Sequence, residues 1–245
     1  MNTPFPQPNF YGTGALMAAN VSVRVGKGNE KEWFPLSPRV RTHCTKLGNL
    51  PHGSTIRGTP ARAFKALIAH RDGDSNFNHL SIGEEKVLRM TEVWILAGQL
   101  NLFSVQNELL SVYRDHYIQK RKLGKPIRVP AAPFDYVRKL YDAGTELRIP
   151  DFLLNWYAGL HGRDLGHRLK NSDLRSTDRH DILATAERNR YYGKDPLVHS
   201  FNRFKVSLER GDSVNPTSLK IEHPPQQQDV MQMQMQHQQQ PQQIQ

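Results

Sequence analysis

The chain has 245 residues, a formal net charge of +10 and only 37% apolar residues, which fits one folded domain of ordinary size flanked by polar segments. Because it contains a single cysteine, Cys44, it cannot be a secreted scaffold held by internal disulfides, and it has no apolar run of about 18 residues that would predict a membrane span. The positive charge would attract nucleic acid, acidic proteins or anionic lipid, although a solvated surface with a basic bias is the more ordinary explanation.

Residues 1–18 carry no charge and are rich in Pro, Asn, Gly and Thr. They lack the basic and apolar regions of a signal peptide, so we predict a disordered leader and an intracellular protein, cytoplasmic or nuclear. Val21–Val25 then alternates apolar and polar residues, which is typical of a half-buried strand. Glycines in the following segment predict a hairpin loop, with Lys31–Leu36 as the return strand.

Helices and one more strand are expected next. A Ser-Pro pair at 37–38 predicts a helix that runs to about Leu47, with Cys44 on its buried face. Ser54–Arg57 is expected to form a short third strand, and the cap-like pair Thr59-Pro60 predicts a further helix.

The segment Thr91–Tyr113 is the most apolar stretch of the chain. Its apolar residues fall on two stripes at helical spacing, separated by a short break, so we predict a hairpin of two antiparallel helices with Ser104 capping the second. The basic segment Gln119–Pro130 is predicted to be a loop or linker. Pro133 and Pro150 begin two more short helices, which complete a predicted folded domain over residues 19–160.

The remaining chain is polar. Residues 161–223 are predicted to form a basic extension, partly helical or disordered, with one candidate helix over Asp181–Tyr191. Residues 224–245 hold 12 glutamines in 22 positions and are predicted to be a Gln-rich disordered tail.

The sequence contains no motif for catalysis, cofactor binding or metal binding. We therefore predict no catalytic, cofactor-binding or metal-binding residues, and we expect no enzyme activity. His161 and His167 are too sparse for a metal site, and Cys44 is expected to be a core residue rather than a nucleophile. The loop that begins at Asp72 imitates the first ligands of a calcium loop, but its sixth position is Phe77 and its twelfth is Gly83, which removes the turn and the essential glutamate.

The order strand, strand, helix, strand, helix and helical hairpin resembles the BTB/POZ domain, and specifically the divergent BTB proteins of filamentous fungi. The segment that carries the resemblance is Leu96–Asn107, in which a Leu-Ala pair, a short turn and a Gln-Asn pair recur as in that family. The resemblance extends over residues 19–160, which we therefore expect to form a BTB/POZ-like domain. The resemblance implies an α+β fold in which a small three-stranded sheet is capped by a cluster of helices and helical hairpins. The chain departs from the family at Ile68–Arg71, where a Leu-Tyr-Thr-Gly ending is usual.

The function that this resemblance implies is a non-enzymatic protein-interaction module, which associates with itself or recruits a partner such as a cullin, in the narrowest case as a ubiquitin-ligase adaptor. The sequence leaves the residues of the interaction site unknown. The alternative is a basic nucleic-acid-associated or transcriptional regulatory protein, which the net charge, the basic linker 119–128 and the Gln-rich tail suggest. Arg188, Arg190, Tyr191 and Tyr192 also mix cations with aromatic rings as single-strand binders do, although they form a single such cluster outside any recognised nucleic-acid fold. Nucleic acid is the less favoured partner, and no membrane partner is expected.

Overall fold

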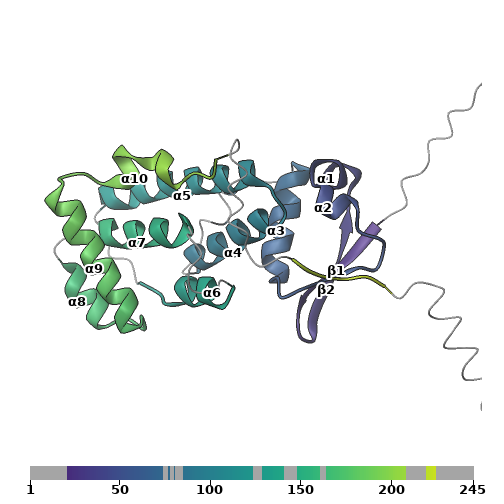
Figure 1. Cartoon of the computed structure of the whole chain (residues 1–245), viewed down its shortest axis with the longest axis horizontal. Coiled ribbons are helices and arrows are strands. Elements are labelled where there is room, and N and C mark those ends of the chain that lie inside the picture. The colour runs from purple at the N-terminus through teal and green to yellow at the C-terminus, as the bar shows by residue number, and fades with distance from the viewer. Residues whose placement is uncertain are drawn as a thin grey trace, which may run out of the picture.

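The computed structural model describes residues 21–73, 77, 80, 85–123, 129–140, 148–160, 164–207 and 219–224. The predicted leader 1–18 lies outside these residues, as does the predicted tail 224–245 apart from Pro224. The described chain is an α+β protein with one small sheet and many helices. Figure 1 shows an elongated molecule that carries the sheet at one end and helices α8 (Leu165–Lys170) and α9 (Ser176–Tyr191) at the other.

The sheet has four strands in the order β2-β1-β3-β4. Strands β1 (Val21–Lys27) and β2 (Glu30–Leu36) form an antiparallel hairpin, β3 (Thr55–Arg57) pairs parallel to β1, and β4 (Lys220–Glu222) pairs antiparallel to β3. The expectation of three strands is therefore wrong by one. Strand β4 forms because the edge of β3, which lies far away in the sequence, offers it backbone partners.

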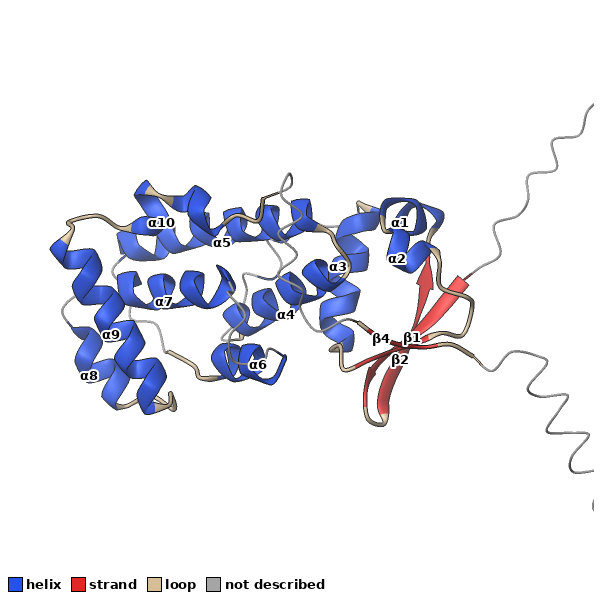
Figure 2. Cartoon of the chain, viewed as in Figure 1, coloured by secondary structure: helices blue, strands red, loops and turns tan. Residues whose placement is uncertain are grey.

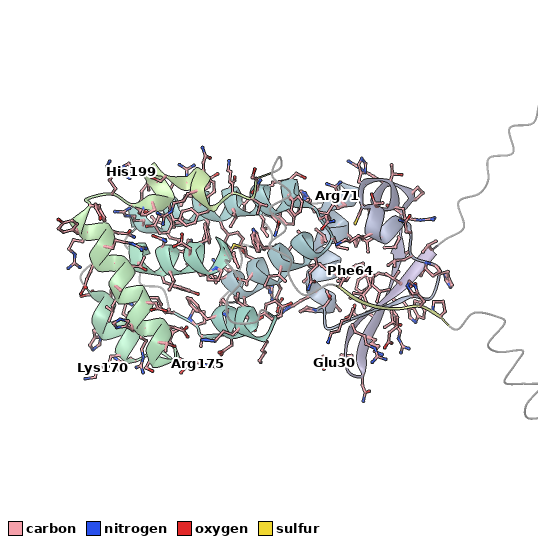
Figure 3. The ribbon with its side chains drawn as sticks, viewed as in Figure 1. Glu30, Phe64, Arg71, Lys170, Arg175 and His199 are labelled. Atoms are coloured by element: carbon pink, nitrogen blue, oxygen red, sulfur yellow. The ribbon has the colours of Figure 1, made fainter. Side chains whose placement is uncertain are left out.

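One face of the sheet packs on helix α3 (Ala61–Asp72), which Figure 2 shows between the sheet and the helices that follow α3 in the chain. The alternating valines of β1 lie on this face, where Val23 pairs with Phe34 of β2. The ring of Phe64 meets the ring of Phe34 edge to face, with 5.2 Å between their centroids. In Figure 3 Phe64 lies at this junction, which joins the sheet to the helical part of the core.

The predicted helix after residue 37 is present but divided. Ser37 caps α1 (Pro38–His43) by accepting from the backbone N–H of Val40 at 3.1 Å, as expected. The chain then becomes extended at Cys44 (φ −133°, ψ 92°) and begins the short helix α2 (Thr45–Gly48). Cys44 still faces the core, where it is 1% exposed.

The predicted hairpin consists of α4 (Lys86–Gln99) and α5 (Phe103–Leu123). Its turn uses Asn101 in the left-handed conformation (φ 60°), with Asn101 N–H donating to the Gly98 carbonyl and Leu102 N–H to that of Ala97. This bond pair satisfies the last carbonyls of α4 and reverses the chain. Ser104 is not the cap that we predicted, because it lies inside the first turn of α5.

Helix α5 also extends beyond the predicted start of the basic loop at Gln119, to Leu123. Gln, Lys and Arg are good helix formers, and cations stabilise a helix C-terminus, so the basic composition favours helix here rather than loop.

The remaining helices cover the hairpin and extend the molecule away from the sheet (Figure 2). They are α6 (Ala132–Leu140), α7 (Arg148–Leu160), α8 (Leu165–Lys170), α9 (Ser176–Tyr191), α10 (Pro196–His199) and the 3-10 helix η3 (Phe201–Phe204). The helix predicted over Asp181–Tyr191 is present, begins five residues earlier and packs against α7.

The core continues across the predicted domain boundary at residue 160. Ile182, Leu197 and Phe204 are buried and belong to the same apolar cluster as the sheet and hairpin residues. The division into 19–160 and 161–223 stays a prediction about domains, but the packing of the described residues crosses it. The polar composition of the later segment reflects helices that bury one narrow face each.

In the described part of the chain, no helix combines the length and the apolar character that crossing a membrane would require.

Candidate interaction surfaces

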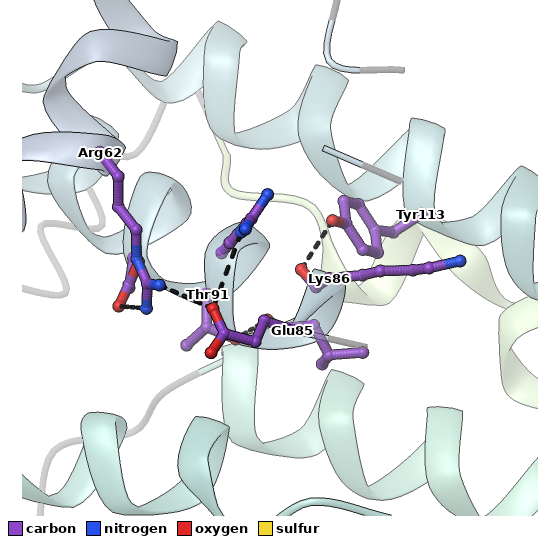
Figure 4. A network of polar contacts seen from close by, with 8 residues as sticks. Arg62, Glu85, Lys86, Thr91 and Tyr113 are labelled. Atoms are coloured by element: carbon purple, nitrogen blue, oxygen red, sulfur yellow. Dashed lines mark hydrogen bonds and ion pairs between the residues drawn. The ribbon is translucent and has the colours of Figure 1, made fainter. Parts of the chain in front are cut away.

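A network of charged side chains joins α3 to α4 (Figure 4). The Arg62 guanidinium donates from Nε and Nη2 to the two carboxylate oxygens of Glu92, both at 2.8 Å, and from Nη1 to Glu85 at 2.7 Å. The Glu92 side chain is 5% exposed, and its hydrogen bonds raise the pKa of Arg62. Both carboxylate oxygens of the buried Glu92 are engaged by Arg62, so the network fixes α3 against α4 and its role is structural.

Asp195 forms a second network, which holds the segment before α10. Its carboxylate accepts from the Tyr117 hydroxyl and the Arg121 guanidinium, and at 2.9 Å from the backbone N–H of Leu197. Burial, followed by the bond to Asp195, raises the pKa of Tyr117, which keeps the phenol protonated and donating. This contact also positions α10 on α5 and is structural.

The structure does not bring together the residues that were considered as metal ligands or as a nucleophile from the sequence. Burial raises the pKa of the Cys44 thiol, which keeps it protonated and a poor nucleophile. Asp72 ends α3 and accepts from the Ser37 hydroxyl, whereas the next positions of the imitated calcium loop, 74 and 76, lie outside the described residues. His167 is exposed on α8, and position 161 is likewise not described. Among the residues described, no group of three or more His, Cys, Asp or Glu side chains gathers as a metal site would need.

An open cavity of about 510 Å³ lies where α5 meets α10 and η3. Its cations are already engaged. Arg114 donates to the Leu197 carbonyl at 2.8 Å and covers the ring of Phe201 with 5.0 Å from its guanidinium carbon to the ring centroid, and Arg203 pairs with Asp151 at 3.3 Å. These side chains seal the edge of the core, so the cavity has little unsatisfied chemistry for a ligand.

The cluster of cationic and aromatic residues noted in the sequence lies at the C-terminal end of helix α9. Tyr191 and Tyr192 are 85% and 67% exposed, and their rings contact each other edge to face at 5.2 Å. Two exposed tyrosines side by side are unusual on a free surface, since each leaves a large apolar ring in water. We call Tyr191 and Tyr192 the tyrosine pair.

The second exposed aromatic feature is the face of the sheet turned away from α3. The strand register places Trp33 of β2 beside Arg24 of β1, and Arg24 in turn beside Thr55 of β3. In the next row on the same face, two residues along each strand, Lys31 and Arg57 flank Gly26, and Lys220 lies beside Arg57. We call this surface the outer sheet face.

Trp33 is the main apolar group of the outer sheet face and is 55% exposed. The ring of His52 stacks loosely on it at 6.3 Å between centroids, and the Arg24 guanidinium carbon lies 6.0 Å from its centroid. The sequence interpretation missed this surface. The alternation of residues in both strands could have indicated it, because it places Arg24 and Trp33 at positions that face solvent. The strand register that makes these two residues neighbours is not visible in the sequence.

Comparisons with protein-family models, curated proteins and solved structures find no match to this chain.

Proposed function

We propose that this chain is a BTB/POZ-like protein-interaction module that works without catalysis, by associating with itself or by recruiting a protein partner. The observation that carries the proposal is the parallel pairing of β3 with β1 across helices α1 and α2, with α3 and the α4–α5 hairpin following. The same order of elements, together with the segment Leu96–Asn107, is what makes the sequence resemble BTB/POZ.

The residues of that segment act in packing, which supports its use as a mark of the fold. Gln106 donates from Nε2 to the Trp94 carbonyl at 3.0 Å inside the hairpin. A Cβ added to Gly98 would lie 2.6 Å from the same nitrogen, so the two helices approach closely where Gly98 faces Gln106. Gly and Gln at these two positions therefore serve one close helix crossing.

The tyrosine pair is the surface that we assign to a protein partner. Tyrosine is enriched in the energetically dominant positions of protein interfaces, because its ring buries a large area and its hydroxyl keeps a hydrogen bond. The pair ends helix α9, which lies at the end of the molecule remote from the sheet (Figure 1) and beyond the part that resembles BTB/POZ. A partner bound there would leave the sheet end free.

The test is multi-angle light scattering of the full chain over a range of concentrations, combined with capture of a purified cullin. We expect association in at least one of the two assays, and we expect a Tyr191→Ser and Tyr192→Ser double variant to weaken it. Leu123→Ser is the matched control, since Leu123 is an exposed apolar residue (61%) elsewhere on the chain. A strict monomer that captures no cullin contradicts the proposal, and cullin capture specifically supports the adaptor role.

One structural observation favours the alternative function, nucleic-acid association, which the basic composition suggested. That observation is the outer sheet face, and it is independent of the interaction-module proposal.

A further inference from the structure

We propose that the outer sheet face binds single-stranded nucleic acid, with a base stacked on Trp33 and the phosphates held by Arg24, Lys31 and Lys220. The site uses only the sheet end of the molecule and does not depend on the BTB/POZ-like proposal.

The strand register arranges the outer sheet face in two rows. One row runs across the strands as Trp33, Arg24, Thr55 and Glu222, and the next runs as Lys31, Gly26, Arg57 and Lys220. Neighbouring strands lie about 4.8 Å apart and the rows about 7 Å apart along each strand. A row that contains an aromatic platform therefore lies beside a row of cations, which is the arrangement that a nucleic-acid strand needs for its bases and its backbone.

The charge of the face is strongly one-sided. Of its acidic side chains, Glu222 is paired with Arg57 at 2.5 Å. Glu30 and Glu32 of β2 alternate to the opposite side of the strand from Lys31 and Trp33. The side chains of Arg24, Lys31 and Lys220 form no ion pair with any described residue, so three cations remain available to phosphates.

Trp33 distinguishes nucleic acid from a purely acidic partner. Its indole is more than half exposed in a chain whose other tryptophans, Trp94 and Trp156, are each only 2% exposed. An acidic peptide would satisfy the cations but would leave this ring in water, whereas every base has a flat face that stacks on it. The segment 225–245 is a poor occupant by charge, because it contains one acidic residue, Asp229, and no Lys or Arg.

The experiment uses the full chain and a labelled, unstructured single-stranded DNA of about 15 nucleotides, a length within the site sizes of such surfaces. We expect binding at low salt with quenching of tryptophan fluorescence. The two buried tryptophans cannot stack on the probe, so the quenching reports on Trp33. Trp33→Ala should weaken binding at least about fivefold, while Trp33→Phe should keep binding within about threefold and lose the quenching.

The cation row is tested separately by salt dependence. Lys31→Ala should reduce the slope of log affinity against log salt by about 0.7, the value for one lost phosphate contact on a single strand. The matched control is Lys170→Ala, because Lys170 is an exposed lysine at the opposite end of the molecule (Figure 3). Thermal unfolding of each variant, monitored by circular dichroism, checks that the substitution leaves the folded protein stable.

Four results would overturn the proposal. They are no binding at low salt, binding that Trp33→Ala leaves unchanged, duplex DNA binding as tightly as the single strand, and polyglutamate binding as tightly with the same quenching. The last result would assign the face to an acidic protein instead.

Discussion

The side chain of Asn107 forms two hydrogen bonds with the backbone of Val206, which lies 99 residues later in the chain. Its Nδ2 donates to the Val206 carbonyl at 2.9 Å, and its Oδ1 accepts from the Val206 N–H at 2.7 Å. The carboxamide thus imitates a neighbouring strand and fastens the segment after η3 onto helix α5. Asn107 belongs to the Gln-Asn pair on which the family resemblance rests, so that pair serves both the hairpin and the later part of the chain.

Asn107→Ala should destabilise the protein by about 1–3 kcal/mol, because it leaves a carbonyl and an N–H of Val206 without their partner in a partly buried place. The measurement is urea unfolding followed by circular dichroism. Asn202→Ala is the control, since Asn202 is exposed on η3, and it should change the free energy of unfolding by less than about 0.5 kcal/mol. Equal effects of the two substitutions would remove the special role of Asn107.

Gly98→Ala should destabilise the protein by about 1–3 kcal/mol, although alanine is the better helix former. The added Cβ would meet Gln106 Nε2 at 2.6 Å, and that nitrogen is held by the Trp94 carbonyl, so relief of the overlap breaks a buried hydrogen bond. Thermal unfolding monitored by circular dichroism measures the change.

Gly166 provides the matched comparison for Gly98. It is also helical, on α8, but a Cβ there meets nothing within 4 Å. Gly166→Ala should therefore stabilise the protein by about 0.4–1 kcal/mol through the reduced entropy of the unfolded chain. A stabilising effect at both positions would show that the hairpin tolerates a wider helix crossing than the structure has.

The sequence predicted those elements whose signals are local. The strand alternation of Val21–Val25, the Ser37 cap and the two apolar stripes of Thr91–Tyr113 all correspond to observed elements, since each depends on neighbours in the chain. Features that depend on distant partners were missed. Strand β4 requires the edge of β3, and the neighbourhood of Trp33 and Arg24 requires the strand register.

Glu92→Gln should destabilise the protein by about 1–3 kcal/mol. The substitution removes the buried negative charge that accepts two bonds from Arg62, and it presents an amide N–H to a guanidinium that cannot accept. Because the Arg62 side chain is 44% exposed, water can rehydrate it, and the loss should stay below that of a fully buried ion pair. Urea unfolding at pH 7 gives the value.

Glu85→Gln is the control for the same network. Glu85 pairs with the same guanidinium at 2.7 Å, but its side chain is 56% exposed, so its ion pair should contribute less than about 1 kcal/mol. A loss at Glu85 as large as that at Glu92 would contradict the assignment of the stabilisation to the buried carboxylate.

His116 should make stability fall as the solution is acidified. Burial, together with the charges of Lys86 and Lys120, lowers the pKa of His116 below its usual 6.5. At a pH between 6.5 and the lower pKa of the folded state, the unfolded chain binds more protons at this residue than the folded chain does. The stability that is fully present above pH 6.5 is therefore lost as the pH falls toward the folded pKa. His116→Gln should flatten this part of a plot of unfolding free energy against pH. An unchanged slope would place the acid sensitivity in other groups.

Cys44 should be inert in the folded protein and reactive in the unfolded one. It is 1% exposed, and burial raises its pKa above the usual 9.0, so both access of a reagent and formation of the thiolate are disfavoured. The measurement is the rate of reaction with a disulfide reagent such as 5,5′-dithiobis(2-nitrobenzoic acid), with and without urea. Since the chain has a single cysteine, the whole signal comes from this residue.

We expect Cys44 to become exposed only when the whole protein unfolds. The rate without urea should then follow the small fraction of unfolded molecules, and it should rise in Asn107→Ala. Rapid stoichiometric labelling of the native protein would instead show that the turn between α1 and α2 opens locally, or that the thiol is activated by its neighbours.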